Sequence, residues 1–209
     1  MRITSKDYHD YVIKDGKFIG EFEQMYQNVD NPWPETKGDM DNNKASLHAK
    51  RFFQNLNITS ALSLGGGTGD HLAWFLQQND LCNSCNVEIS STACKISRDK
   101  YPSLKVENKS ILSYLENAKL EQFDLIIMRE IIWYILSDID MIYQNLKLNF
   151  PGKYILVELT FPEDQKYGRE YFFGIDNFLS KFEFQIIEKL VEKKETTDDY
   201  GYLMVIGKI

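Results

Sequence analysis

A run of glycines between an apolar segment and a helical pattern constrains the fold of this chain more than any other feature. Residues 61–70 read Ala-Leu-Ser-Leu-Gly-Gly-Gly-Thr-Gly-Asp, and residues 71–76 continue with a sequence that can run as a helix. A buried strand, a tight turn and a helix start mark the place where an α/β sheet presents its ligand site. The glycines let the backbone approach a ligand closely, and the helix directs unpaired N–H groups and its positive dipole end to the same spot.

The spacing of the glycines and of the next acidic residue indicates the kind of ligand. Gly65, Gly67 and Gly69 form G-x-G-x-G, whereas the dinucleotide fingerprint G-x-G-x-x-G requires a glycine where Asp70 stands. Glu88 ends a predicted strand about 20 residues further on, where a carboxylate can accept hydrogen bonds from both hydroxyls of a ribose. The pair predicts an adenosine-type ligand and disfavours a nicotinamide-dependent enzyme.

Residues 61–70 followed by Glu88 resemble motif I and the acidic loop of class I S-adenosylmethionine (SAM)-dependent methyltransferases. The resemblance implies a Rossmann-like, doubly wound sheet of seven mostly parallel strands with an antiparallel last strand, and it implies SAM as the cofactor. One departure is Ser63, because the family usually has an acidic residue two positions before its first motif glycine. The cofactor contacts expected from the resemblance are Gly65, Gly66, Gly67, Gly69, Glu88, Ile89, Ser110, Ile111 and Arg129.

The rest of the chain alternates between strand and helix patterns, as an α/β fold requires. We expect strands at 61–64, 86–89, 104–107, 123–128, 153–159, 183–191 and 202–207, and helices at 44–57, 71–78, 91–100, 111–120, 138–148 and 176–182. The last two strands are joined by a short polar connection and should be antiparallel. Residues 44–209 therefore read as the SAM-binding domain.

Residues 1–43 form a polar N-terminal arm rich in turn residues. Within it, Phe18, Phe22, Met25 and Tyr26 share one face of a predicted helix over 18–26, and a rigid turn around Trp33 follows. The arm packs this aromatic stripe on the core or serves as a lid over the SAM pocket. We weight the two interpretations equally, because a packed arm can also be a lid.

Composition excludes several classes of protein. The net charge of −7 argues against general attraction to nucleic acid. No segment approaches the ~20 apolar residues of a membrane span, and residues 1–7 lack an apolar signal core, so we expect a cytoplasmic protein. Cys82 and Cys85 form C-x-x-C without a second pair at metal spacing, so we expect a reduced loop pair and no metal site.

The expected catalytic edge offers few groups for chemistry. Methyl transfer is an in-line displacement, so alignment and exclusion of water do most of the work, and a base is needed only when the acceptor begins protonated. Arg129 and Glu130 are adjacent charges after an apolar strand, and Glu130 is the candidate base; a structural ion pair or helix cap is the alternative. The resemblance implies a contact with the adenine amino group at Ser110, where many family members carry an acidic residue; Asn108 is the alternative.

A narrower resemblance concerns the acceptor. Tyr26 with Asn31-Pro32-Trp33, the segment 129–134, and Gln165-x-Tyr167-Gly168 resemble small-molecule methyltransferases of bacterial surface-glycan clusters, similar to capsular enzymes that O-methylate a phosphoramidate carried on a nucleotide. That group usually has Asp where Asn31 stands. The substrate contacts expected from it and from the loop after the fifth strand are Tyr26, Trp33, Tyr134, Lys166, Tyr167 and Arg169. The alternatives without a function are a core position for Tyr134 and a solvated loop for Lys166, Tyr167 and Arg169.

Two rival functions remain at this point. The glycines and the segment 87–89 also resemble aminopropyltransferases, although Arg129-Glu130 does not match the acidic pattern that those enzymes place after the fourth strand. A SAM-binding partner protein without catalysis is the other, favoured by the departures at Ser63 and Ser110.

Overall fold

The computed structural model describes residues 3–33, 37–81, 83–116, 122–193 and 201–209. Its main sheet has seven strands in the order β5-β4-β3-β6-β7-β9-β8. Their bounds are β3 (Ser60–Leu64), β4 (Asn83–Glu88), β5 (Lys105–Asn108), β6 (Leu125–Arg129), β7 (Tyr154–Phe161), β8 (Gln185–Lys193) and β9 (Gly201–Lys208). β5, β4, β3, β6 and β7 are parallel to one another, and β9 is antiparallel to both of its neighbours. The predicted fold class is confirmed.

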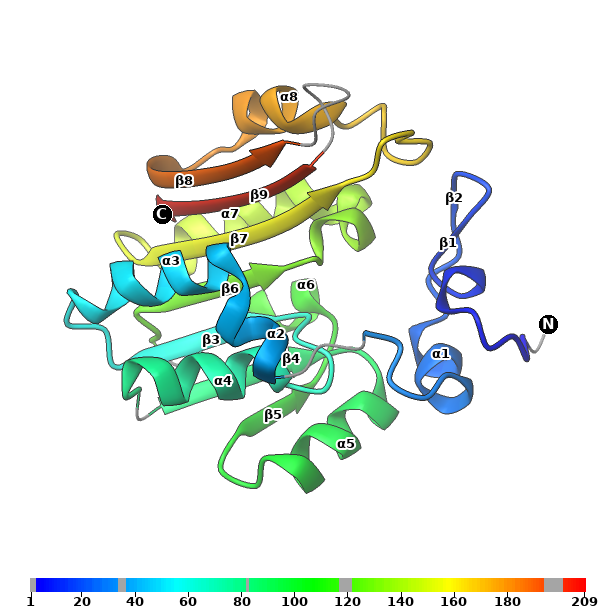
Figure 1. The fold of residues 1–209 in the computed structure, drawn as a ribbon, viewed down its shortest axis with the longest axis horizontal. Coiled ribbons are helices and arrows are strands. Elements are labelled where there is room, and N and C mark those ends of the chain that lie inside the picture. The colour runs from blue at the N-terminus through cyan, green and yellow to red at the C-terminus, as the bar shows by residue number, and fades with distance from the viewer. Residues whose placement is uncertain (1–2, 34–36, 82, 117–121, 194–200) are drawn as a thin grey trace.

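Helices cover both faces of this sheet (Figure 1). The described helices are α1 (Phe22–Asn28), α2 (Lys37–Asn42), α3 (Lys44–Gln54), α4 (Asp70–Asn79), α5 (Ser91–Lys100), α6 (Ile111–Leu115), α7 (Ile139–Asn149) and α8 (Gly174–Lys181). α2, α3 and α4 pack on one face, and α6, α7 and α8 pack on the other. Because crossover helices shield both faces, the central strands β3 and β6 are apolar and buried almost throughout.

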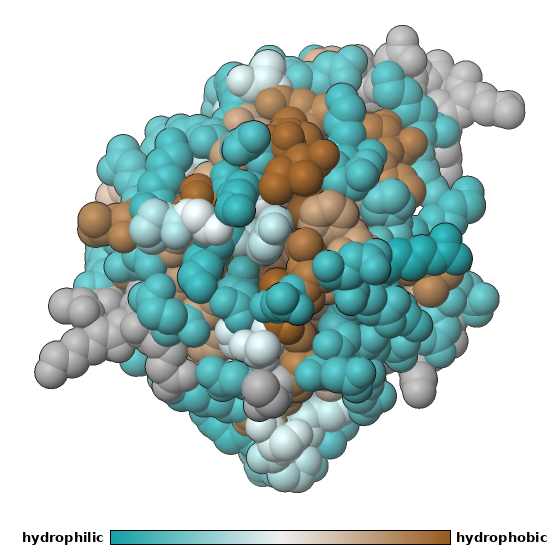
Figure 2. Space-filling model, turned by 90° about the vertical axis from the view of Figure 1, so that its left-hand side faces the viewer, coloured by the Kyte–Doolittle hydropathy of each residue, from teal (hydrophilic) through white to brown (hydrophobic). Residues whose placement is uncertain are grey.

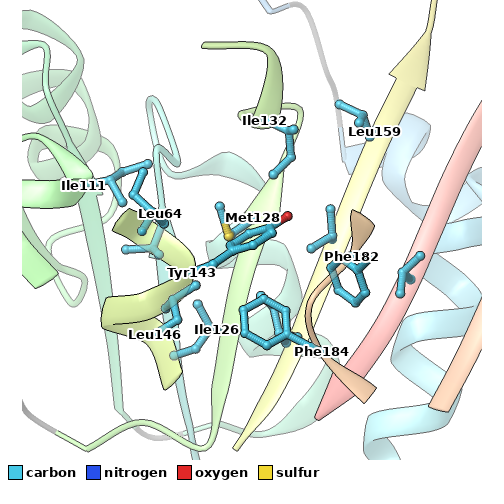
Figure 3. Packing of buried hydrophobic residues seen from close by; sticks show 14 of the residues in the cluster. Leu64, Ile111, Ile126, Met128, Ile132, Tyr143, Leu146, Leu159, Phe182 and Phe184 are labelled. Atoms are coloured by element: carbon cyan, nitrogen blue, oxygen red, sulfur yellow. The ribbon is translucent and has the colours of Figure 1, made fainter. Parts of the chain in front are cut away.

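The larger of the two core clusters that pack on the sheet lies beneath α6, α7 and α8. Figure 3 shows Ile126 and Met128 of β6 directed towards Tyr143 and Leu146 of α7. Phe182, which follows α8, packs edge-on against Phe184 with 5.3 Å between ring centroids. This packing buries Ile126 and Met128 of β6, and the candidate base Glu130 follows the carboxyl end of this strand.

The N-terminal arm differs from its prediction in one respect. A hairpin of β1 (Ile13–Lys14) and β2 (Lys17–Phe18) comes first, and the helix begins only at Phe22. Phe18 is therefore in a strand and does not share a helical face with Met25. The reason is local: Asp15 and Gly16 adopt positive φ, which closes a tight hairpin. In Figure 1 the arm lies beyond the edge at which the parallel strands end.

The start of β4 is a second correction. We expected a loop as far as residue 84, but β4 begins at Asn83, where it pairs with Ser60 of β3. Pairing to a central strand overrides the turn preference of Asn and Ser. Cys85 is consequently buried inside a strand and does not belong to a loop pair. Cys82 lies outside the described residues.

The remaining helices agree closely with prediction, and two differences are small. α6 ends at Leu115, and the rest of the predicted helix over 111–120 falls largely outside the described residues. α3 ends at Gln54, three residues before the predicted end.

Figure 2 shows the side of the molecule opposite the arm, where hydrophobic side chains form a central band among hydrophilic ones. Within the described ranges, no helix has the length and apolar character needed to cross a bilayer.

Candidate functional site

A cavity of about 420 Å³ lies at the edge where the parallel strands end. Its wall combines the glycine turn, the residues that follow β4, β5 and β6, and side chains of the arm. Such an edge is where open α/β sheets bind ligands, and the volume falls within the ~300–1,000 Å³ range of small-molecule sites. The cavity therefore brings together most of the predicted cofactor residues.

The glycine turn is held in place by side chains from β3 and β4. Gly67 has φ +54°, its N–H donates to Glu88 Oε2 at 3.0 Å, and its carbonyl accepts from Asn86 Nδ2 at 3.0 Å. A Cβ atom at Gly66 would collide with Asn86 Oδ1 and Ser63 Oγ. The turn requires glycine because neighbouring polar side chains occupy the space where a side chain would stand.

Glu88 presents a buried carboxylate at the cavity wall. The residue is 6% exposed, and its Oε1 accepts a hydrogen bond from the Ser90 N–H at 2.8 Å. Burial raises the pKa of this carboxyl, against the opposing effect of the backbone hydrogen bonds. Each carboxylate oxygen has a further lone pair for a ligand hydroxyl.

The expected adenine side of the cavity is formed by Ile89, Ser110 and Ile111. Ile89 is 57% exposed although it is apolar, and Ile111 is buried. Ser110 caps α6, because its Oγ accepts from the Ser113 N–H at 3.2 Å. Asn108 is not part of the described wall; its amide donates to the carbonyls of Glu88 and Ile89 at 3.0 and 2.8 Å, which ties the ends of β4 and β5 together.

Glu130 lies in the wall immediately after β6. Its φ is +52°, a left-handed conformation that is uncommon outside glycine and asparagine. The carboxylate accepts from the backbone N–H and the hydroxyl of Thr160 at 3.0 and 2.7 Å. These two hydrogen bonds lower the pKa of the carboxyl, but burial raises it by more, so the pKa lies above its usual value. A half-buried carboxyl with a raised pKa, on a strained backbone segment at a cavity wall, has the properties of a functional group.

Arg129 is also in the wall, and it forms the structural ion pair that was the alternative interpretation. Its Nε donates to Glu158 Oε2 at 2.6 Å, and the Tyr202 hydroxyl donates to the same oxygen at 2.7 Å. Glu158 is fully buried, and burial alone would raise its pKa; Arg129, His71 and Tyr202 outweigh this effect and hold the pKa below its usual value. The carboxylate is therefore ionised beneath the cavity.

The arm contributes an aromatic wall. Trp33 Nε1 donates to the Tyr26 hydroxyl at 3.0 Å, and the rings of Trp33 and Tyr134 are 6.2 Å apart. Phe22 packs edge-on against Tyr134 with 5.2 Å between centroids. The Tyr26 hydroxyl also lies 2.7 Å from the position that a Cβ atom of Gly67 would take. The arm is thus packed on the core and lies against the glycine turn, and its role as a lid stays a prediction.

The three predicted substrate contacts in the loop after β7 do not belong to the described wall; they are Lys166, Tyr167 and Arg169. Lys166 is exposed and pairs with Asp164 at 2.9 Å. The Tyr167 ring stacks on Phe18 at 6.0 Å, and the Arg169 guanidinium lies 4.4 Å from the Phe173 ring centroid. Their roles in acceptor binding stay predictions with no support from this geometry.

Among the residues that were not predicted from the sequence, Phe22 and His71 lie in the wall, Asn86 holds the glycine turn and Glu23 attaches the arm. Phe22 had been assigned to packing of the arm. Asn86 and His71 carried a usable signal, since each is a polar residue in a buried segment next to the glycines. Glu23 had none, because its partners at residues 90–92 are far away in the sequence. Among the described residues, no cluster of His, Cys, Asp or Glu has the composition to hold a metal ion.

Comparison with solved structures places this architecture in the class I methyltransferase fold. NodS, an N-methyltransferase of Bradyrhizobium japonicum solved with S-adenosyl-L-homocysteine (SAH), matches with a TM-score of 0.63 at 13% identity, over 89% of this chain and 97% of NodS. A SAM-dependent methyltransferase of Mesorhizobium loti matches with a TM-score of 0.57 at 16% identity, over 81% of this chain and 100% of that one. The methyltransferase domain of bacterial CtHen1-C matches with a TM-score of 0.62 at 11% identity, over 81% of this chain and 98% of that one.

At these identities the likeness concerns the fold. No protein-family model matches the chain, and no curated protein matches its sequence.

Proposed function

We propose that this protein is a SAM-dependent methyltransferase that acts on a small molecule. The observation that carries the proposal is the buried carboxylate of Glu88 beside the Gly67 turn, at the wall of a cavity of suitable volume. Glu88 has the place of a ribose-binding acid in a sheet of this topology. NodS is described with SAH, the demethylated product of SAM, and supports the same ligand class here.

The residues present fit the nucleoside half of SAM. Gly65, Gly66 and Gly67 line the cavity and carry no side chains, so a ligand can approach the backbone of the turn. Apolar Ile89 and Ile111 are suitable neighbours for a purine ring. The exposure of Ile89 in this structure is the kind of apolar surface that a ligand covers.

SAM supplies a methyl group on a positively charged sulfur, which makes the methyl carbon open to attack. The chain's part is to align the acceptor and exclude water, and the aromatic residues of the arm roof the cavity for this purpose. Glu130 is the group placed to take a proton when the acceptor begins as a hydroxyl or an amine.

The first test is calorimetric binding of SAH. Glu88→Gln should weaken SAH binding by roughly 10- to 100-fold, because hydrogen bonds to a charged group are worth about 1.5–3 kcal/mol. The exposed Glu163→Gln is the matched control and should leave binding unchanged. Absence of SAH binding in the wild-type chain would contradict the proposal, and NADH bound in place of SAH would favour a nicotinamide enzyme.

Turnover separates the proposal from its rivals. Methyl transfer from SAM to any acceptor supports a methyltransferase, transfer of an aminopropyl group from decarboxylated SAM supports an aminopropyltransferase, and binding without turnover supports a non-catalytic partner protein.

The second, narrower candidate is O-methylation of a nucleotide-linked phosphoramidate in bacterial capsule modification. The observation in its favour is that Trp33 and Tyr134, from two segments of the resemblance, meet at the cavity wall. The position of Lys166 and Arg169 away from the wall counts against it. Mass spectrometry of nucleotide-linked phosphoramidate after incubation with SAM tests it, and no added methyl group under conditions where SAH binds would remove it.

A further inference from the structure

We propose that Arg129 binds the carboxylate at the amino-acid end of the methyl donor, and that Glu158 and Tyr202 position Arg129 for this task. The inference rests on the proposed function and deepens it, because it assigns the part of the donor that Glu88 and the glycine turn do not hold. It also predicts that the site distinguishes SAM from its decarboxylated form.

The register of the sheet places Arg129 across the glycine turn from Glu88. Leu64 of β3 pairs with Val87 of β4, so Gly65 continues the strand beside Glu88. On the other side, Ser63 pairs with Ile127 of β6, so Gly65 continues beside Arg129. A donor whose ribose binds Glu88 and whose chain crosses the turn therefore reaches the end of β6, about two strand spacings or ~10 Å away.

The positions of the positively charged side chains also favour a donor that runs from Glu88 towards the end of β6. Two of the described wall residues carry permanent positive side chains, Lys109 and Arg129. Lys109 follows β5, on the far side of Glu88, and pairs with Glu107 at 3.4 Å. Arg129 is on the β6 side, which is the side towards which the amino-acid end must run. His71, from the first turn of α4, lies in the same part of the wall, with its Nε2 4.0 Å from Glu158 Oε2.

Ser63 removes the alternative arrangement in which an acidic residue of β3 contacts the donor's amino group directly. Its hydroxyl lies against the glycine turn instead, close to the position of a Cβ atom at Gly66. An arginine is suited to the opposite end of the same zwitterion, since its planar guanidinium matches a carboxylate in a forked geometry.

The polar residues beneath Arg129 make its position precise. Arg129 and Glu158 are directly paired across β6 and β7, and Glu158 is fully buried. Tyr202 reaches the same carboxylate oxygen from β9, the antiparallel strand. A buried ion pair with an additional hydrogen bond orients the guanidinium and prevents other rotamers. Glu158 and Tyr202 act through Arg129 and are positioning residues.

Two ligands that differ only in the amino-acid end test the proposal. SAH carries this end, and 5′-methylthioadenosine lacks it while keeping the nucleoside and the sulfur. Calorimetry of Arg129→Lys should show SAH binding weakened by roughly 10- to 100-fold, with 5′-methylthioadenosine binding unchanged within about twofold. Lysine keeps a positive charge beside Glu158 and loses the forked geometry.

Tyr202→Phe provides a second variant that keeps the ion pair. It should weaken SAH binding about threefold to tenfold and leave 5′-methylthioadenosine binding unchanged, because Glu158 loses the hydrogen bond from the Tyr202 hydroxyl and orients Arg129 less well. Tyr143→Phe, which removes the hydroxyl of a buried tyrosine in the core beneath α7, is the matched control and should change neither affinity. If Arg129→Lys does not fold, Tyr202→Phe alone decides.

The outcomes are distinct. The inference is overturned if Arg129→Lys or Tyr202→Phe weakens the binding of SAH and of 5′-methylthioadenosine equally, or changes neither affinity. Either result leaves the proposed function intact. Decarboxylated SAM that binds the wild-type chain as tightly as SAM also overturns it. If neither SAH nor 5′-methylthioadenosine binds the wild-type chain, the proposed function fails and the inference fails with it.

Discussion

At the scale of single residues, the site depends on three carboxylates that the fold treats differently. Glu88 is buried between backbone N–H donors, Glu130 is half-buried on a left-handed backbone, and Glu158 is buried with a permanent counter-charge. Burial raises the pKa of Glu88 and Glu130, whereas Arg129, His71 and Tyr202 together lower that of Glu158 against its burial. Environments that separate pKa values in this way assign different roles to the same chemical group.

Glu130→Gln should reduce turnover by roughly 10²-fold or more while SAH affinity is retained, because the variant keeps the shape and loses the proton acceptor. Steady-state kinetics with the acceptor, once identified, gives the first quantity and calorimetry gives the second. Glu163→Gln is the matched control. A fall in SAH affinity would place Glu130 in the cofactor site instead.

The raised pKa of Glu130 also sets the sign of a pH effect. A base works in its ionised form, and a raised pKa means that this form is gained at a higher pH than for an exposed glutamate. Turnover should therefore rise with pH through the raised pKa, and the rise should disappear in Glu130→Gln. A pH–rate profile that is the same in both proteins would remove the assignment.

At the scale of elements, one carboxylate of the arm links α1 to the start of α5, in addition to the aromatic packing described above. Glu23 of α1 accepts from the Ser90 hydroxyl at 2.8 Å and from the backbone N–H and hydroxyl of Thr92 at 3.1 and 2.7 Å, at the start of α5. Burial opposes ionisation, but these hydrogen bonds outweigh it and lower the pKa of Glu23 to about 2. A carboxylate at a helix N-terminus also interacts favourably with the helix dipole.

Glu23→Gln should loosen the arm. Loss of a helix cap costs about 1 kcal/mol, or roughly a fivefold larger population of the undocked arm. Hydrogen exchange of residues 22–28 measures this population. Glu21→Gln is the control, since Glu21 bonds Gln24 of its own helix. Equal exchange in Glu23→Gln and the wild type would contradict the assigned anchor.

The same contact predicts a pH dependence of docking. The folded pKa of Glu23 lies below its usual value of 4.5, so its contribution is fully present above that value and is lost as pH falls towards about 2. The protection factor of α1, which is the exchange rate corrected for the intrinsic pH dependence of amide exchange, should fall over this interval in the wild type and less in Glu23→Gln.

At the scale of the whole molecule, the sheet and its helices form the body, and the arm completes the ligand cavity. α2, which lies within the first 43 residues, packs against α3 and α4, and Asp41 accepts from Trp74 Nε1 at 2.7 Å. Residues before α2 contact the body mainly at the cavity and at α5. The division after residue 43 stays a prediction, and this packing suggests that an experimental boundary belongs before α2.

Removal of residues 1–33 tests this division. The shortened chain should still unfold cooperatively, because both core clusters of the sheet stay intact. Its SAH affinity should fall by about tenfold or more, since Phe22, Tyr26 and Trp33 no longer cover the cavity. Denaturant unfolding followed by circular dichroism and calorimetry provide the two measurements. A shortened chain that does not fold would show that the arm belongs to the core.

Much of the architecture was predictable because it rests on local patterns. The glycines, the apolar runs of β3 and β6 and the helical periodicity of α4, α5 and α7 are determined by neighbours in the chain, and they predict the sheet and its ligand edge. Glu88 was predictable for the same reason, since its distance from the glycines is set by one helix and one strand.

The errors occurred where distant contacts override local preference. β4 begins early because β3 is available to pair with it, and Phe18 belongs to a hairpin that two residues of positive φ close. Lys166 and Arg169 contact neighbouring groups in their own loop outside the described cavity wall, and their roles in acceptor binding stay predictions.

The sequence by itself determined the strand-turn-helix unit, the position of the acidic residue after the next strand and the order of the alternating elements. All of these depend on spacing along the chain. Only the tertiary structure decided that Arg129 lies across the turn from Glu88 above a buried Glu158, and that Glu23 attaches the arm to α5. These contacts join residues 29 to 69 positions apart, and parallel pairing and helix packing, which no local pattern encodes, bring them together.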